Sequence, residues 1–186
     1  MPDYDETIIT QYIKEGDDAD TSTGEGRSNK GKALERLLGY LFTQIPSVTV
    51  TATNILNGEK DQEIDVAIFH TGPDDPLSEF FMVILIECKF WNAAIGPDEV
   101  TRFSTKLVDR GLDFGIIVAM AGISGKWKPA EGAYATIGKE LTKGQRIIVL
   151  TRKDIEGLKT TDAFVGVIHK RLLDLILYGN PGPFLL

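Results

Sequence analysis

A glutamate and a lysine stand two positions apart at the end of a strongly apolar segment. Residues 81–86 are all apolar, and Glu87, Cys88 and Lys89 follow directly. Alternate side chains of a strand share a face, so Glu87 and Lys89 are predicted to point together while Cys88 points away. A metal ion with a polarised water would satisfy this carboxylate and ammonium. A simple ion pair would satisfy them equally well, and the short motif alone favours that alternative.

A second acid strengthens the case for a metal. Asp65 lies within a predicted strand, residues 63–69, that we expect to neighbour the strand of Glu87. An acid there is unfavourable unless it lies at the rim of the sheet or binds a cation. An edge-strand position facing water is the ordinary alternative. Glu63 shares the face of Asp65 and is expected to face solvent or to contact Asp65 without binding the metal itself.

A third acid, Glu35, comes from the helix predicted for residues 32–44. It lies at the border of the apolar face of that helix, where it could reach inward or lie in solvent, and the helical pattern favours solvent. Three carboxylates and one lysine from a helix and two strands would make an oxygen-rich site. Such a site suits Mg²⁺, with Mn²⁺ as a substitute, whereas zinc prefers histidine and cysteine ligands.

Hydrophobic periodicity predicts the elements that position these residues. Helices are predicted over residues 6–14, 32–44, 97–110, 130–142 and 162–178, and strands over 47–53, 63–69, 80–89, 114–120 and 146–151. Asn57-Gly58 is typical of a hairpin turn. The early strands suit an antiparallel meander, and the later, helix-linked strands suit parallel crossovers. The fold class is therefore predicted as α/β, a mixed β-sheet flanked by helices.

The domain organisation is predicted from the same pattern. Residues 15–31 are rich in glycine and polar residues and are expected to form a flexible loop. We therefore expect an N-terminal arm or short helix with a flexible loop over 1–30, one domain over 31–180, and an irregular tail over 181–186.

The order Glu35, Asp65 and Glu87-Cys88-Lys89 resembles the PD-(D/E)xK, or restriction-endonuclease-like, nuclease superfamily, and is nearest to its Mrr-like branch. The resemblance covers roughly residues 31–151 and implies an αβββαβ core. Ile64 stands in place of the proline of the family's name, which many members lack. Arg102 stands in the region where RecB-like members carry a glutamine, which argues against that branch.

The resemblance implies a Mg²⁺-dependent endonuclease that hydrolyses phosphodiester bonds of DNA, with RNA as an alternative substrate. Asp65 would be the central metal ligand, Glu87 the second and the backbone carbonyl of Cys88 the third. Lys89 would orient or deprotonate the attacking water and steady the charge on the phosphate. Glu35 would bind the metal through water or position a second ion. A role in restriction or phage defence and a homodimer, or a partner protein that supplies specificity, are expected on the same basis.

Basic and aromatic residues elsewhere are candidates for nucleic-acid contacts. The predicted Gly-rich loop after residue 120 carries two lysines that flank an aromatic, which could contact phosphate and stack on a base: Lys126, Trp127 and Lys128. A surface loop with the tryptophan packed onto the domain is the alternative. Arg102 is a further candidate contact. A basic entrance near Glu35 could be formed by Arg27, Lys30 and Lys32, which could also be merely solvated.

Composition and net charge limit the classes of function that the sequence allows. The net charge of −7 counts against a passive nucleic-acid binder but constrains a metal-dependent nuclease less. The chain has one cysteine, no membrane-length apolar run and no secretory signal, so we expect a cytoplasmic protein without membrane contact. Two alternatives remain open: a catalytically inactive nuclease-like fold that serves as a nucleic-acid-binding or assembly module, and an α/β domain whose charged strand ends are only structural.

Overall fold

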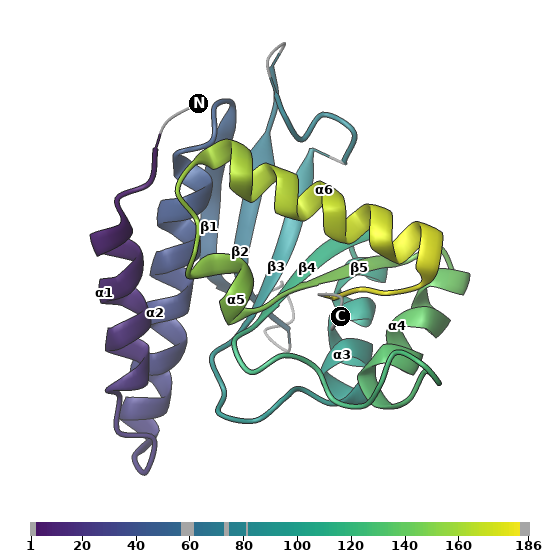
Figure 1. Ribbon diagram of the computed structural model, residues 1–186, viewed down its shortest axis with the longest axis horizontal. Helices are drawn as coiled ribbons and strands as arrows, with labels where there is room; N and C mark the ends of the chain where they lie inside the picture. The colour runs from purple at the N-terminus through teal and green to yellow at the C-terminus, as the bar shows by residue number, and fades with distance from the viewer. Residues whose placement is uncertain (1–2, 57–61, 73–74, 81, 183–186) are drawn as a thin grey trace.

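The computed structural model describes residues 3–56, 62–72, 75–80 and 82–182. Within these ranges the helices are α1 (Glu6–Asp17), α2 (Gly24–Thr43), α3 (Pro97–Val108), α4 (Gly132–Thr142), α5 (Arg152–Ile155) and α6 (Thr161–Tyr178). The strands are β1 (Val48–Leu56), β2 (Glu63–His70), β3 (Val83–Lys89), β4 (Phe114–Ala119) and β5 (Arg146–Leu150). They form one sheet in the order β1-β2-β3-β4-β5 (Figure 1).

The sheet is mixed, as the sequence predicts. Strands β1, β2 and β3 pair antiparallel, whereas β3, β4 and β5 pair parallel. Parallel neighbours need crossover connections, which α3 and α4 supply. The predicted α/β class, with a mixed sheet flanked by helices, is confirmed.

Helices cover both faces of the sheet. On one face lie α2 and α6, whose Phe42 and Phe164 meet edge to face with ring centroids 5.0 Å apart. On the other face α3 packs so closely on β4 that a Cβ added to Gly115 would stand 2.7 Å from the ring of Phe103. Figure 1 shows α6 crossing in front of the strands, with α1 and α2 side by side at the left. Strands β3, β4 and β5 are therefore buried from both sides, whereas β1 and the start of β2 remain partly exposed.

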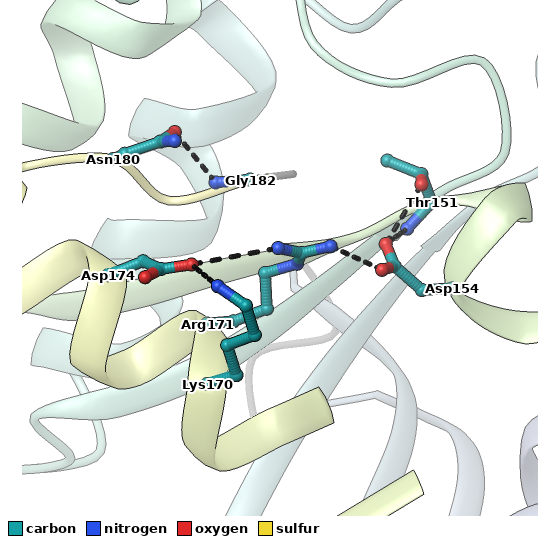
Figure 2. A network of polar contacts seen from close by, with 7 residues as sticks. All are labelled: Thr151, Asp154, Lys170, Arg171, Asp174, Asn180 and Gly182. Carbon is teal, nitrogen blue, oxygen red and sulfur yellow. Dashed lines mark hydrogen bonds and ion pairs between the residues drawn. The ribbon is translucent and has the colours of Figure 1, made fainter. Parts of the chain in front are cut away.

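A buried ion-pair network fixes α6 against the end of β5 (Figure 2). Arg171 contacts Asp154 and Asp174, and all three side chains are less than one-tenth exposed. The second oxygen of Asp154 accepts hydrogen bonds of 2.8 Å from the backbone N–H and the hydroxyl of Thr151. Charges this deeply buried are tolerated only when they are paired, so the network specifies how α5, α6 and β5 meet.

The predicted flexible loop over residues 15–31 is wrong at both ends, because α1 continues to Asp17 and α2 begins at Gly24. The hydroxyl of Thr23 caps α2 by accepting a hydrogen bond from the N–H of Gly26. A Cβ on Gly26 would lie 1.8 Å from the carbonyl oxygen of Asp20, so glycine is needed for the close turn. Gly26 thus permits a close turn between α1 and α2 instead of marking a flexible loop.

Other differences are smaller. The N-terminal segment joins the core through Tyr4, Ile9 and Ile13, which are buried. Strand β3 begins at Val83 instead of residue 80, because residues 76–79 form a turn and residues 80 and 82 form bends, and the short helix α5 was not predicted. The predicted Asn57-Gly58 turn lies outside the described residues. The domain boundary expected at residue 31 stays a prediction, although α2 runs across it. In the described part of the chain, no helix combines the length and apolar character needed to cross a membrane.

Candidate active site

The register of β2 and β3 brings the predicted acids together. Val66 pairs with Ile86 and Ala67 with Leu85, so the next position along places Asp65 opposite Glu87. Directly opposed residues share a face of the sheet. Asp65 accepts a hydrogen bond of 2.6 Å from the backbone N–H of Cys88, and Lys89 Nζ lies 2.7 Å from Glu87 Oε1. Two acids and one ammonium therefore meet at one end of the sheet.

These side chains line one cavity of about 240 Å³. Helix α3 closes it with residues spaced three and four apart, which share one face of a helix. The cavity is lined by Glu63, Asp65, Glu87, Lys89, Trp91, Glu99, Arg102 and Lys106. Carboxylates and cations are thus nearly balanced in number, which suits a site that must bind both a metal ion and an anion.

Polar contacts fix α3 over the cavity. Lys106 Nζ lies 2.7 Å from Glu87 Oε2, so each oxygen of that carboxylate meets a different lysine. The carboxylate of Glu99 accepts a 3.0 Å hydrogen bond from the N–H of Gly96 and closes the start of the helix. Beyond its end, Arg110 donates to Gln62 Oε1 at 2.7 Å, which ties the helix to the start of β2. The C-terminal half of α3 is thereby held relative to the acids through Lys106 and Arg110.

Burial and charge shift the ionisation of the site. Burial and, after it, the Glu87 charge raise the pKa of Asp65, the Cys88 N–H and the two lysines offset only part of this, and the resulting pKa is about 6. Burial alone would lower the pKa of Lys89, but the adjacent Glu87 carboxylate reverses that effect and leaves the pKa above its ordinary value. Lys89 is therefore an ammonium at neutral pH, whereas the folded site disfavours the ionised form of Asp65.

A comparison with known families decides the class of the protein. The family model Mrr_cat, described as Restriction endonuclease, matches residues 27–158, more than two thirds of the chain. The chain belongs to this restriction endonuclease family. The resemblance drawn from the order of Glu35, Asp65 and Glu87-Cys88-Lys89 is confirmed, and so is the restriction-endonuclease-like fold. The protein is a nuclease of restriction-endonuclease type. No curated protein matched the chain.

The donor set of this restriction endonuclease fits a hard divalent cation. Asp65 and Glu87 offer carboxylate oxygens, and a cation would relieve the repulsion that raises the pKa of Asp65. Over the described ranges, no three His, Cys, Asp or Glu side chains form a metal-binding group by themselves. Mg²⁺ is commonly held by one or two carboxylates, with water and substrate phosphates completing its shell. The residues therefore fit a divalent ion for which the protein supplies only part of the coordination shell. Binding requires the Glu87 carboxylate to turn away from Lys89 and Lys106.

Glu35 does not join the cavity. It lies on α2, half-buried, and its Oε2 accepts a 2.7 Å hydrogen bond from Asn54 Nδ2. The pKa of the Cys88 thiol is raised mainly by burial, and the Glu35 charge also raises it. The Cys88 side chain points to the α2 side of the sheet, where it lines a pocket with residues of that helix. Glu35 therefore lies outside the lining of the restriction endonuclease site and is tied to β1 instead.

The predicted nucleic-acid contacts separate into two groups. Arg102 lines the cavity. The loop residues Lys126, Trp127 and Lys128 do not; the indole N–H of Trp127 donates to the carbonyl of Tyr178 at 3.3 Å, and Lys128 Nζ lies 4.1 Å from the indole ring centroid. This tryptophan is packed against the end of α6, which favours the structural alternative for the loop.

Sequence reasoning missed two charged residues of the site, Glu99 and Lys106. Both lie on the same face of α3 as Arg102, and their spacing was available in the sequence. That face was not singled out because its charges are those of an ordinary solvated surface. Only the crossing of α3 over the ends of β2 and β3 reveals that it borders the cavity.

Proposed function

We propose that this restriction endonuclease hydrolyses DNA phosphodiester bonds with Mg²⁺, or Mn²⁺ in its place, held by Asp65 and Glu87. One observation carries the proposal: Asp65, Glu87 and Lys89 converge from adjacent strands on one cavity. A bound divalent ion would lower the pKa of a ligated water and neutralise charge on the phosphate. The carbonyl of Cys88, next to the N–H that orients Asp65, is proposed as a further ligand.

Lys89 is proposed to act as an electrostatic clamp. Its pKa is raised, so it keeps its proton at neutral pH and is a poor general base. An ammonium fixed by Glu87 at the cavity can instead orient the attacking water and stabilise charge on the phosphate. Arg102 and Lys106 would neutralise phosphate oxygens from the side of α3. Preorganised charge of this kind is typically the largest contribution to catalysis.

The resemblance also gives Glu35 a contact with the ion through water or a second ion. Since Glu35 is bound to Asn54 and does not line the cavity, this role is tested separately by a Glu35→Gln variant. A place in restriction or phage defence in the cytoplasm, and pairing of two copies for double-strand cutting, belong to the same proposal.

The test is cleavage of plasmid and single-stranded DNA, and of RNA, with Mg²⁺, Mn²⁺ or EDTA. We expect cleavage of DNA with either ion and none in EDTA. Lys89→Met should lower turnover at least about 100-fold, as loss of one charge-stabilising group does elsewhere. Lys139→Met, which removes an exposed lysine of α4 outside the cavity, is the matched control and should cleave as the wild type does. Wild-type turnover by Lys89→Met would contradict the proposed role of Lys89.

A second candidate, a nuclease fold that binds without turnover, is favoured by one feature. Both oxygens of Glu87 are already engaged by lysines 2.7 Å away, an arrangement that is stable without any ion. Binding of DNA by the wild type, together with the absence of cleavage under any divalent ion, would establish this alternative.

A further inference from the structure

A second pocket lies at the end of β3 on the opposite side of the sheet from the acids. It has a volume of about 240 Å³, and its lining includes Arg27, Lys30, Cys88, Phe90, Trp91 and Asn92. Strand alternation explains the division: Glu87 and Lys89 point into the first cavity, whereas Cys88 points into the second. We refer to this second pocket as the basic pocket.

The basic pocket holds a buried ammonium whose direct contacts are to uncharged groups, although Asp17 interacts with its charge from beyond ion-pair distance. Lys30 is only 6% exposed, yet its Nζ contacts the neutral Asn92 Oδ1 at 2.6 Å and the Phe90 ring at 5.0 Å from the centroid. In the part of the chain that the structure describes, no carboxylate lies within ion-pair distance of this ammonium. The nearby Asp17 is engaged by Arg152 at 2.6 Å instead. A buried ammonium of this kind is costly unless an anion completes its surroundings.

Among the residues that the structure describes, no carboxylate lines the basic pocket, whereas four line the first cavity. Arg27, an exposed residue of α2, adds a second cation. This local excess of positive charge contrasts with the net charge of −7 of the chain. The volume lies below the roughly 300–1,000 Å³ of small-molecule sites, which suits a phosphate group better than a whole nucleotide.

Trp91 joins the two pockets. It lines both, is 47% exposed, and its ring centroid lies 5.3 Å from Lys89 Nζ. An exposed indole between two phosphate-binding positions is placed to stack on a base, which binds sequence-tolerantly because every base has a π-face. A strand that passes the end of β3 would therefore meet the acids, then Trp91, then Lys30.

We propose that the basic pocket binds a backbone phosphate neighbouring the one that is cut, and that Trp91 stacks on a base between them. The inference rests on the proposed function for the identity of the cut phosphate. This phosphate binding is separable from cleavage, because neither Lys30 nor Arg27 is among the residues assigned to hydrolysis. Lys32, two residues from Lys30, is exposed and is not part of the lining.

The test is the affinity of a fluorescent DNA oligonucleotide in EDTA, measured by anisotropy over a series of salt concentrations. We expect Lys30→Met to weaken binding about five- to tenfold and to reduce the slope of log K against log salt by about 0.9, the value for one lost phosphate contact. Lys32→Met makes the same change in net charge and should differ from the wild type less than about twofold. Arg27→Gln, at an exposed position, gives the same test without altering a buried side chain.

Trp91 is tested in the same assay. Trp91→Ala should weaken binding roughly 5- to 150-fold, the range for loss of one stacked base, whereas Trp91→Phe should keep most of the affinity. If Lys30→Met and Arg27→Gln bind like Lys32→Met, the basic pocket is no phosphate site, even when the wild type cleaves DNA. If both bind weakly while no divalent ion supports cleavage, the proposed function fails and the phosphate site stands.

Discussion

Replacing Asp65 by asparagine should stabilise the metal-free protein. Asparagine keeps the shape of the side chain and an oxygen that can accept the hydrogen bond from the Cys88 N–H. It removes a charge that burial and Glu87 disfavour. A substitution that improves stability while abolishing function is expected where a strained site serves catalysis.

The magnitude follows from the pKa of Asp65. A rise from 3.8 in the unfolded chain to about 6 in the folded protein corresponds to roughly 3 kcal/mol against folding at neutral pH. Because the side chain is only partly buried, screening by water reduces the expected gain to between about 1 and 3 kcal/mol.

The sign of the pH dependence is fixed. Between pH 4 and 6 the folded protein holds a proton on Asp65 that the unfolded chain has lost, so stability falls as the pH rises through this window. The advantage of Asp65→Asn should therefore be complete above pH 7 and only about one third as large at pH 4.5. Urea denaturation in EDTA at the two pH values measures the difference in free energy of unfolding between Asp65→Asn and the wild type. The pH-dependent contributions of the other carboxylates are common to both proteins and drop out of this difference.

Glu63→Gln is the matched control, since Glu63 lines the same cavity but is exposed. It should change stability by less than about 0.5 kcal/mol at either pH. Saturating Mn²⁺, at 100 times its dissociation constant, should add about 2.7 kcal/mol to the wild type and little to Asp65→Asn. An Asp65→Asn protein that is less stable than the wild type at pH 8, or equally affected at both pH values, would refute the account of a strained carboxylate.

Three further predictions concern other parts of the molecule. Arg171→Met leaves Asp154 buried without its ion-pair partner, while Asp174 keeps Lys170, and should cost about 3–5 kcal/mol in urea denaturation; a loss below 1 kcal/mol would show that the Arg171 ion pair is dispensable. Gly115→Ala should cost about 1–3 kcal/mol because its methyl group meets Phe103 at 2.7 Å, whereas Gly39→Ala, with open space around it, should be neutral or stabilising by thermal melting. Lys106→Met frees one oxygen of Glu87 and should tighten Mn²⁺ binding roughly tenfold in calorimetry, about 1.4 kcal/mol; weaker binding would contradict competition between the ion and Lys106.

The strand-borne part of the site was predictable because the period of a strand is two. Alternation alone placed Glu87 and Lys89 on one face, and the expected pairing of their strand with that of Asp65 was correct. Register is strongly specified where one face of a sheet is buried, so the local pattern sufficed to bring these residues together.

The helix-borne part was not predictable from periodicity. The position of a helix along its own axis, and its crossing angle over the sheet, depend on packing at places such as Gly115 and on contacts such as Arg110 with Gln62. Lys106 was therefore missed, and the role that the resemblance gives Glu35 stays a prediction, since Glu35 does not line the cavity. The glycines near Gly26 were read as disorder because a close backbone approach has no signature in composition.

The most direct test of the metal site is a crystal structure with Mn²⁺ and its anomalous difference map. We expect one peak between the carboxylates of Asp65 and Glu87, with at least one oxygen of Glu87 withdrawn from its lysine. At saturating Mn²⁺, a map with no peak there and both lysine contacts of Glu87 intact would contradict the proposed metal-dependent hydrolysis.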